Sequence, residues 1–141
     1  MQRVHVTHHF TQAPQRVYDF LSEHENLGAL FGLKVERLND GTDGTRNGVG
    51  SARKLSVAGV APFVETVTEA VPGARIVYEI TKGSPLKGHR GVLDFKAAAD
   101  GGTDLDYVID FGGKLPGADV VVAAALRRSI PRGLAKAARE A

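Results

Sequence analysis

Four polar side chains interrupt predicted strand faces that are otherwise apolar. These side chains are Glu65, Tyr78, His89 and Tyr107. Glutamate and histidine can transfer protons, and tyrosine hydroxyls can stabilise a developing enolate. A carboxylate among inward-facing residues must find a partner or have its pKa raised by burial. The pattern favours polar contacts, or acid–base chemistry, with a ligand that carries oxygen atoms.

A purely structural interpretation of the same four residues stays open. The two tyrosines are then core aromatics with satisfied hydroxyls, and the other two residues lie at the solvated ends of their strands. Glu65 and His89 are two strands apart in the predicted sheet, a separation of roughly 10 Å. We therefore expect them to contact a ligand separately instead of forming a catalytic dyad.

Arg53 is a further candidate, because it shares a strand face with Leu55 and Val57. A guanidinium at this position could neutralise Glu65 or bind a ligand carboxylate with two hydrogen bonds. The alternative is an exposed arginine near the edge of the sheet.

These residues are predicted to lie on strands separated by short turns, a spacing that favours an antiparallel meander. Two short helices are expected after the first strand, one beginning near Pro14 and one ending at Gly32. The predicted strands are Val4–Phe10, Leu33–Leu38, Ser51–Val57, Phe63–Val71, Arg75–Thr81, Gly88–Ala97 and Asp104–Phe111.

The C-terminal segment Ala118–Glu140 has the periodicity of one long amphipathic helix, with Pro131 expected to kink it. A single helix cannot cover a whole sheet, so we expect the sheet to curl around it and leave a cavity. The predicted cavity residues are Arg53, Phe63, Glu65, Tyr78, His89, Leu93, Tyr107, Val122, Leu126 and Ile130.

Length and composition narrow the possible classes of protein. The 141 residues are expected to form a single domain, and a net charge of +2 gives no reason to expect nucleic acid as a partner. The absence of cysteine excludes thiolate nucleophiles and thiolate metal sites. No apolar run has the length of a signal peptide or a membrane span, so we expect a cytoplasmic protein without stable membrane insertion.

Two clusters, one of histidines and one of basic residues, do not indicate a metal site or a binding site. His5 and His9 are about 13 Å apart along a strand, and His8 points to the other face, so no metal site is expected. The helix face with Arg128, Arg132, Lys136 and Arg139 could contact anionic membranes or nucleic acid, but simple solvation explains it as well.

The order of elements, together with several local phrases, resembles the SRPBCC superfamily of START-like, helix-grip proteins, including its polyketide cyclase/dehydrase-like members. The phrases are residues 10–21, Gly50–Arg53, Glu65–Glu69, Arg75–Tyr78, Gly102–Thr103 and the terminal Leu126–Leu134 helix. The resemblance implies an α+β fold in which a curved seven-stranded antiparallel sheet grips the C-terminal helix around an apolar cavity.

The leading functional hypothesis is binding of a small, mainly hydrophobic molecule in this cavity, by a monomer or a homodimer without a cofactor. The alternative is a polyketide cyclase/dehydratase-like enzyme. In that case Glu65 or His89 would move a proton, and Tyr107 or Arg53 would stabilise an enolate. A third hypothesis is an accessory or chaperone-like role, which would require an exposed apolar patch.

Overall fold

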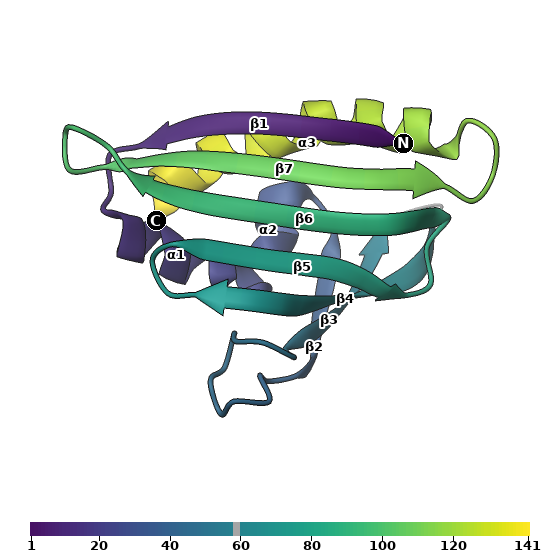
Figure 1. The fold of residues 1–141 in the computed structure, drawn as a ribbon, viewed down its shortest axis with the longest axis horizontal. Helices are drawn as coiled ribbons and strands as arrows, with labels where there is room; N and C mark the ends of the chain where they lie inside the picture. Colours follow the sequence, from purple (N-terminus) through teal and green to yellow (C-terminus); the bar gives the residue numbers. More distant parts are fainter. Residues whose placement is uncertain (58–59) are drawn as a thin grey trace.

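The computed structural model describes residues 1–57 and 60–141 (Figure 1). Its elements follow the predicted order, and only a three-residue 3₁₀ helix, η1, was not predicted. The bounds are β1 Gln2–Phe10, α1 Pro14–Ser22, η1 His24–Asn26, α2 Leu27–Phe31, β2 Lys34–Asn39, β3 Ala52–Val57, β4 Val60–Val71, β5 Arg75–Lys82, β6 Leu86–Ala97, β7 Thr103–Gly113 and α3 Ala118–Glu140.

The seven strands form one antiparallel sheet in the order β1-β7-β6-β5-β4-β3-β2. At one edge of the sheet, the last strand, β7, lies beside the first strand, β1. All other neighbouring strands are consecutive in sequence. The pairing of β4 with β5 shifts twice, near Glu65 and near Thr68. Such bulges bend a strand and strengthen its twist, which helps the sheet to curl.

Strands β6 and β7 extend further than the sequence predicted. Leu86 pairs with Gly113, and Lys87 pairs with Gly112. The glycines at these positions led the sequence pattern to indicate turns, but the two strands continue to pair there.

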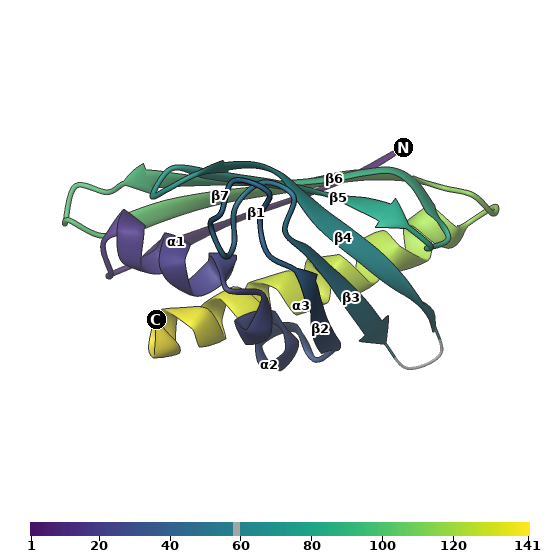
Figure 2. The ribbon, with the colours of Figure 1, turned by 90° about the horizontal axis from the view of Figure 1, so that it is seen from below.

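The helices lie on the concave side of the sheet (Figure 2). α3 runs diagonally across this side as one helix through Pro131 and contacts β1, β7 and α2. The core between the layers includes Phe10, Leu105, Phe111 and Leu134, each no more than 1% exposed. The curled sheet therefore encloses the inner face of α3, as the sequence predicted.

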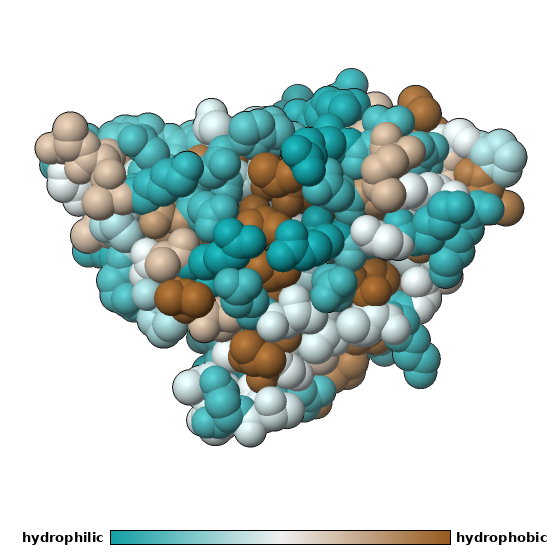
Figure 3. Space-filling model, viewed as in Figure 1, coloured by the Kyte–Doolittle hydropathy of each residue, from teal (hydrophilic) through white to brown (hydrophobic). Residues whose placement is uncertain are grey.

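The outer face of the sheet is mainly polar (Figure 3). On β1 and β7, Arg3 pairs with Asp110 at 2.7 Å and His5 pairs with Asp106. His9 lies on the same face and bonds Asp104 and Asp100, at 2.8 Å each. His8 points to the other side, where its ring lies 4.9 Å from that of Phe10. The predicted strand alternation is confirmed here.

Candidate functional site

A cavity of about 150 Å³ lies between the concave side of the sheet and the helices. Of the 21 described residues that line it, thirteen are aliphatic or phenylalanine, so most of its surface is apolar. The lining includes nine of the ten residues predicted from sequence: Arg53, Phe63, Glu65, Tyr78, His89, Leu93, Tyr107, Leu126 and Ile130.

The tenth predicted residue, Val122, does not line the cavity. It packs against the hydrophobic core from the first half of α3. The helix reaches the cavity one turn later, through Leu126, Ser129 and Ile130. The helical periodicity correctly placed Val122 on the inner face of α3, but it could not show how far along the helix the cavity extends.

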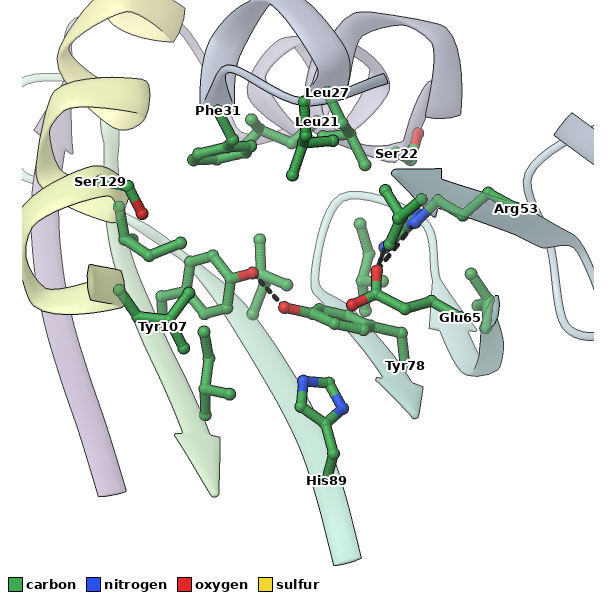
Figure 4. A pocket seen from close by; sticks show the side chains of 18 of the residues that line it. Leu21, Ser22, Leu27, Phe31, Arg53, Glu65, Tyr78, His89, Tyr107 and Ser129 are labelled. Atoms are coloured by element: carbon green, nitrogen blue, oxygen red, sulfur yellow. Dashed lines mark hydrogen bonds and ion pairs between the residues drawn. The ribbon is translucent and has the colours of Figure 1, made fainter. Parts of the chain in front are cut away.

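The helical wall opposite the sheet was not predicted from sequence. It contains Leu21, Leu27 and Phe31, which come from α1 and α2, with Ser22 beside them (Figure 4). In the sequence, each of these short helices carries an apolar stripe, with Val17 and Leu21 in the first and Leu27 and Phe31 in the second. A stripe indicates that one helix face is buried, but it does not indicate which partner covers it.

Arg53 and Glu65 form an ion pair directly across β3 and β4. Arg53 Nη2 and Nε donate to the same carboxylate oxygen, Glu65 Oε1, at 2.8 Å and 3.0 Å. The side chains are only 7% and 12% exposed, so Arg53 is not the exposed edge residue that the sequence left open. Figure 4 shows Glu65 directed into the cavity. Among the described residues, only its Oε1 atom has a hydrogen-bond partner, so the second oxygen can accept a hydrogen bond from a ligand.

Two tyrosine hydroxyls meet inside the cavity. The Tyr78 and Tyr107 hydroxyls form a hydrogen bond with each other, and burial raises the pKa of both groups. Both tyrosines are therefore neutral at physiological pH. Because their mutual bond uses only one of the two hydroxyl protons, the other proton is available to a ligand. Arg53 also lies over the Tyr78 ring, 5.1 Å from its centre, which favours a cation–π interaction.

His89 is held as a neutral hydrogen-bond donor. Its Nδ1 atom accepts a bond from the Ile80 backbone N–H at 3.2 Å, so the ring proton must lie on Nε2. Burial lowers the pKa of His89, which keeps the imidazole uncharged. The ring points into the cavity below Tyr78, with 5.5 Å between the ring centres. Within the described residues it has no direct bond to Glu65, so these are two separate contact groups.

Glycines bring two aromatic rings to the cavity. Tyr78 lies directly over Gly91 of β6, and a Cβ atom there would collide with its ring. Phe31 packs in the same way on Gly133 of α3. Each glycine lacks the atom that would push the ring away, so the two backbones determine where the rings lie.

His24 of η1 is a buried histidine that was not predicted from the sequence. Ser51 Oγ donates to the Gly48 carbonyl at 2.7 Å, so His24 Nε2 must be the donor in its 3.2 Å bond to Ser51. His24 Nδ1 is then a buried acceptor, without a partner among the described residues. Burial and the nearby Arg53 lower the pKa of His24 to about 3. This neutral ring supports the loop that brings Asn47 to the cavity.

The family described as "Polyketide cyclase / dehydrase and lipid transport" matches residues 1–141. The chain belongs to this family. The resemblance and the helix-grip fold predicted from sequence are thereby confirmed. A comparison with curated protein sequences finds no match.

Solved structures of other proteins share the fold of this chain. The Zhui aromatase/cyclase from Streptomyces sp. R1128 has a TM-score of 0.79 and 19% identity, over 99% of this chain and 92% of that one. A START superfamily protein from Mycobacterium smegmatis has a TM-score of 0.77 and 18% identity, over 96% and 92%. The Aha1 dimer from Colwellia psychrerythraea has a TM-score of 0.70 and 14% identity, over 96% and 92%.

Two further features concern possible partners. Within residues 1–57 and 60–141, no helix is both long enough and apolar enough to cross a membrane. The same residues contain no group of three or more histidine, aspartate or glutamate side chains placed to hold a metal ion.

Proposed function

We propose that the protein binds a small, mainly hydrophobic molecule in the cavity between the sheet and α3. The observation that carries this proposal is a mainly apolar cavity whose charged, tyrosine and histidine groups all come from the sheet (Figure 4). Such pockets bury the body of a ligand and orient it through a few hydrogen bonds. A cytoplasmic location and a monomeric or homodimeric state stay predictions.

The cavity supports a ligand of limited size and definite polarity. An apolar cavity of about 150 Å³ accommodates a benzene-sized molecule. His89 Nε2–H and one tyrosine hydroxyl are donors on the same wall, and the second oxygen of Glu65 is an acceptor. We therefore infer a single-ring ligand with a carbonyl or similar acceptor oxygen, and with a hydroxyl group that reaches Glu65.

Thermal unfolding in the presence of small aromatic ketones, phenols, short fatty acids and flavonoids tests the proposal. A ligand at 100 times its Kd stabilises the folded state by about 2.7 kcal/mol. Tyr78→Phe and His89→Ala should weaken binding of a hit. Tyr18→Phe is the matched control, because Tyr18 is buried against Phe95 and does not line the cavity. Equal affinity in all three variants would contradict the proposed binding wall.

A cyclase- or dehydratase-like enzyme is the second candidate function. It is supported by the convergence of Arg53, Tyr78 and His89 on the wall where a ligand carbonyl would lie. Their donors would stabilise an enolate oxygen, and the free oxygen of Glu65 would take the proton. His89 is less suited to act as the base, because its unprotonated Nδ1 is bonded to the backbone.

Turnover of a model polyketide tests the catalytic candidate. Glu65→Gln should abolish turnover while Tyr18→Phe leaves it unchanged. Turnover that survives Glu65→Gln would remove the acid–base role. Binding without any turnover would leave the binding function alone.

A further inference from the structure

One side of α3 faces away from the sheet (Figure 2). Two kinds of exposed residues lie on this side or close to it. Leu115, in the turn bonded to the start of the helix, is 66% exposed, and Val120 and Val121 are 57% and 69% exposed. Further along, Arg128, Arg132 and Arg139 are exposed as well. We call these six residues the outer stripe.

Helical geometry places four of these six residues on one side of α3, while Val120 lies about 100° from Val121 around the helix axis and Leu115 precedes the helix. At 100° per residue, Val121 and the three arginines lie within about 40° of one another around the helix axis. The sequence showed the basic residues of this face, and solvation alone explained them. The structure adds large apolar side chains that are more than half exposed.

The charges of the stripe are also uncompensated. None of its three arginines forms an ion pair with a residue that the structure describes, whereas five arginines elsewhere do. These are Arg3, Arg37, Arg46, Arg53 and Arg75. α3 carries five basic and two acidic residues, while the whole chain has a net charge of only +2. The positive charge of the protein is therefore concentrated on this helix.

We propose that the outer stripe binds reversibly to the surface of a membrane that contains anionic lipids. Leu115, Val120 and Val121 would enter the boundary between headgroups and acyl chains, while the arginines contact lipid phosphates. This proposal goes beyond ligand binding, because no residue of the stripe lines the cavity.

Two other occupants fit the stripe less well. A nucleic acid would bind the arginines but would gain nothing from three exposed aliphatic side chains. In a second copy of the chain, parallel pairing would bring the arginine rows together, and antiparallel pairing would place arginines against valines. An anionic membrane surface offers acyl chains to the three aliphatic side chains and phosphates to the three arginines.

Cosedimentation with lipid vesicles tests the proposal. The protein should bind vesicles that contain phosphatidylglycerol but not vesicles of phosphatidylcholine alone, and added salt should release it. A basic residue near an anionic surface contributes about fivefold in affinity. Replacing Arg128, Arg132 and Arg139 together by Gln should therefore weaken binding by about 100-fold.

Matched variants separate the stripe from net charge and general hydrophobicity. Arg16→Gln, Arg90→Gln and Lys96→Gln combined remove the same charge from other exposed sites and should change binding by less than about twofold. Val120→Gln with Val121→Gln should weaken vesicle binding about tenfold, whereas Val71→Gln, at an exposed strand end, should not.

Three results would overturn the proposal. The first is equal binding to both kinds of vesicle, or equal binding by the wild type and the triple arginine variant. The second is binding to a fluorescent DNA or RNA oligonucleotide without binding to vesicles. The third is a dimer in sedimentation equilibrium that Val120→Gln and Val121→Gln dissociate, again without vesicle binding. Ligand affinity in the cavity should stay unchanged in all stripe variants, so the two proposals fail separately.

Discussion

Tyr78 on β5 lies flat over Gly91, its direct partner on β6, and this brings its hydroxyl to Tyr107 on β7. A side chain on Gly91 would lift the ring and break the tyrosine pair. Strand pairing thus determines which polar group reaches the cavity.

Gly91→Ala should therefore destabilise the protein by about 1–3 kcal/mol, as expected for overpacking in a core. Denaturant unfolding measures the effect. The same substitution in a Tyr78→Ala background should cost much less, because the colliding ring is absent. Equal costs in both backgrounds would show that the ring does not depend on the glycine.

The ion pair of Arg53 and Glu65 predicts strong coupling between two substitutions. Glu65→Leu leaves the buried Arg53 guanidinium unpaired and should destabilise the protein by about 3–5 kcal/mol. Combining it with Arg53→Met should restore most of this loss, because apolar replacements of a buried pair are close to neutral. Urea unfolding of both single variants and the double variant gives the coupling. If the destabilisation of the double variant equals the sum of those of the two single variants, the two charges are not coupled and water solvates the pair.

His24 predicts a pH dependence of stability. Its folded pKa of about 3 lies below the usual 6.5, so the unfolded chain binds the proton more readily. The stabilisation is complete above about pH 6.5 and decreases as the pH falls toward 3, by up to about 1.4 kcal/mol per pH unit. Between about pH 7 and about pH 5, His24→Gln should lose about 2 kcal/mol less stability than the wild type.

A suitable control for this measurement is Tyr18→Phe, because burial raises the pKa of Tyr18 from its usual 10 and this group does not titrate between about pH 5 and about pH 7. It should follow the wild-type pH dependence. If His24→Gln also follows it, the buried ring does not account for the acid sensitivity.

The pKa values of two neighbouring histidines on β1, His8 and His9, should be shifted in opposite directions. Hydrogen bonds that His9 donates to Asp104 and Asp100 raise the pKa of His9, and burial lowers the pKa of His8. An NMR titration should give a midpoint above 6.5 for His9 and below 6.5 for His8. Asp104→Asn should lower the His9 midpoint and leave that of His8 nearly unchanged. Reversed midpoints would contradict the strand orientation.

Much of the sheet and its inner face followed from the sequence, because strand alternation assigns each side chain to a face. Tyr78, His89 and Tyr107 were placed in the cavity on this basis. The Arg53–Glu65 pair depended on the register of β3 against β4, which alternation alone leaves open. His24 gave no signal, since its burial results from the packing of η1 against the loop before β3.

Phe31 is held by a glycine of α3 on the helical wall, opposite the polar wall of the sheet. Substituting Phe31 by a smaller residue would therefore leave a void that no side chain at position 133 fills. The capacity of the cavity can be enlarged from this side while every hydrogen-bonding group stays in place. Ligand size and ligand polarity are consequently separable traits in this protein, open to independent change by selection or by engineering.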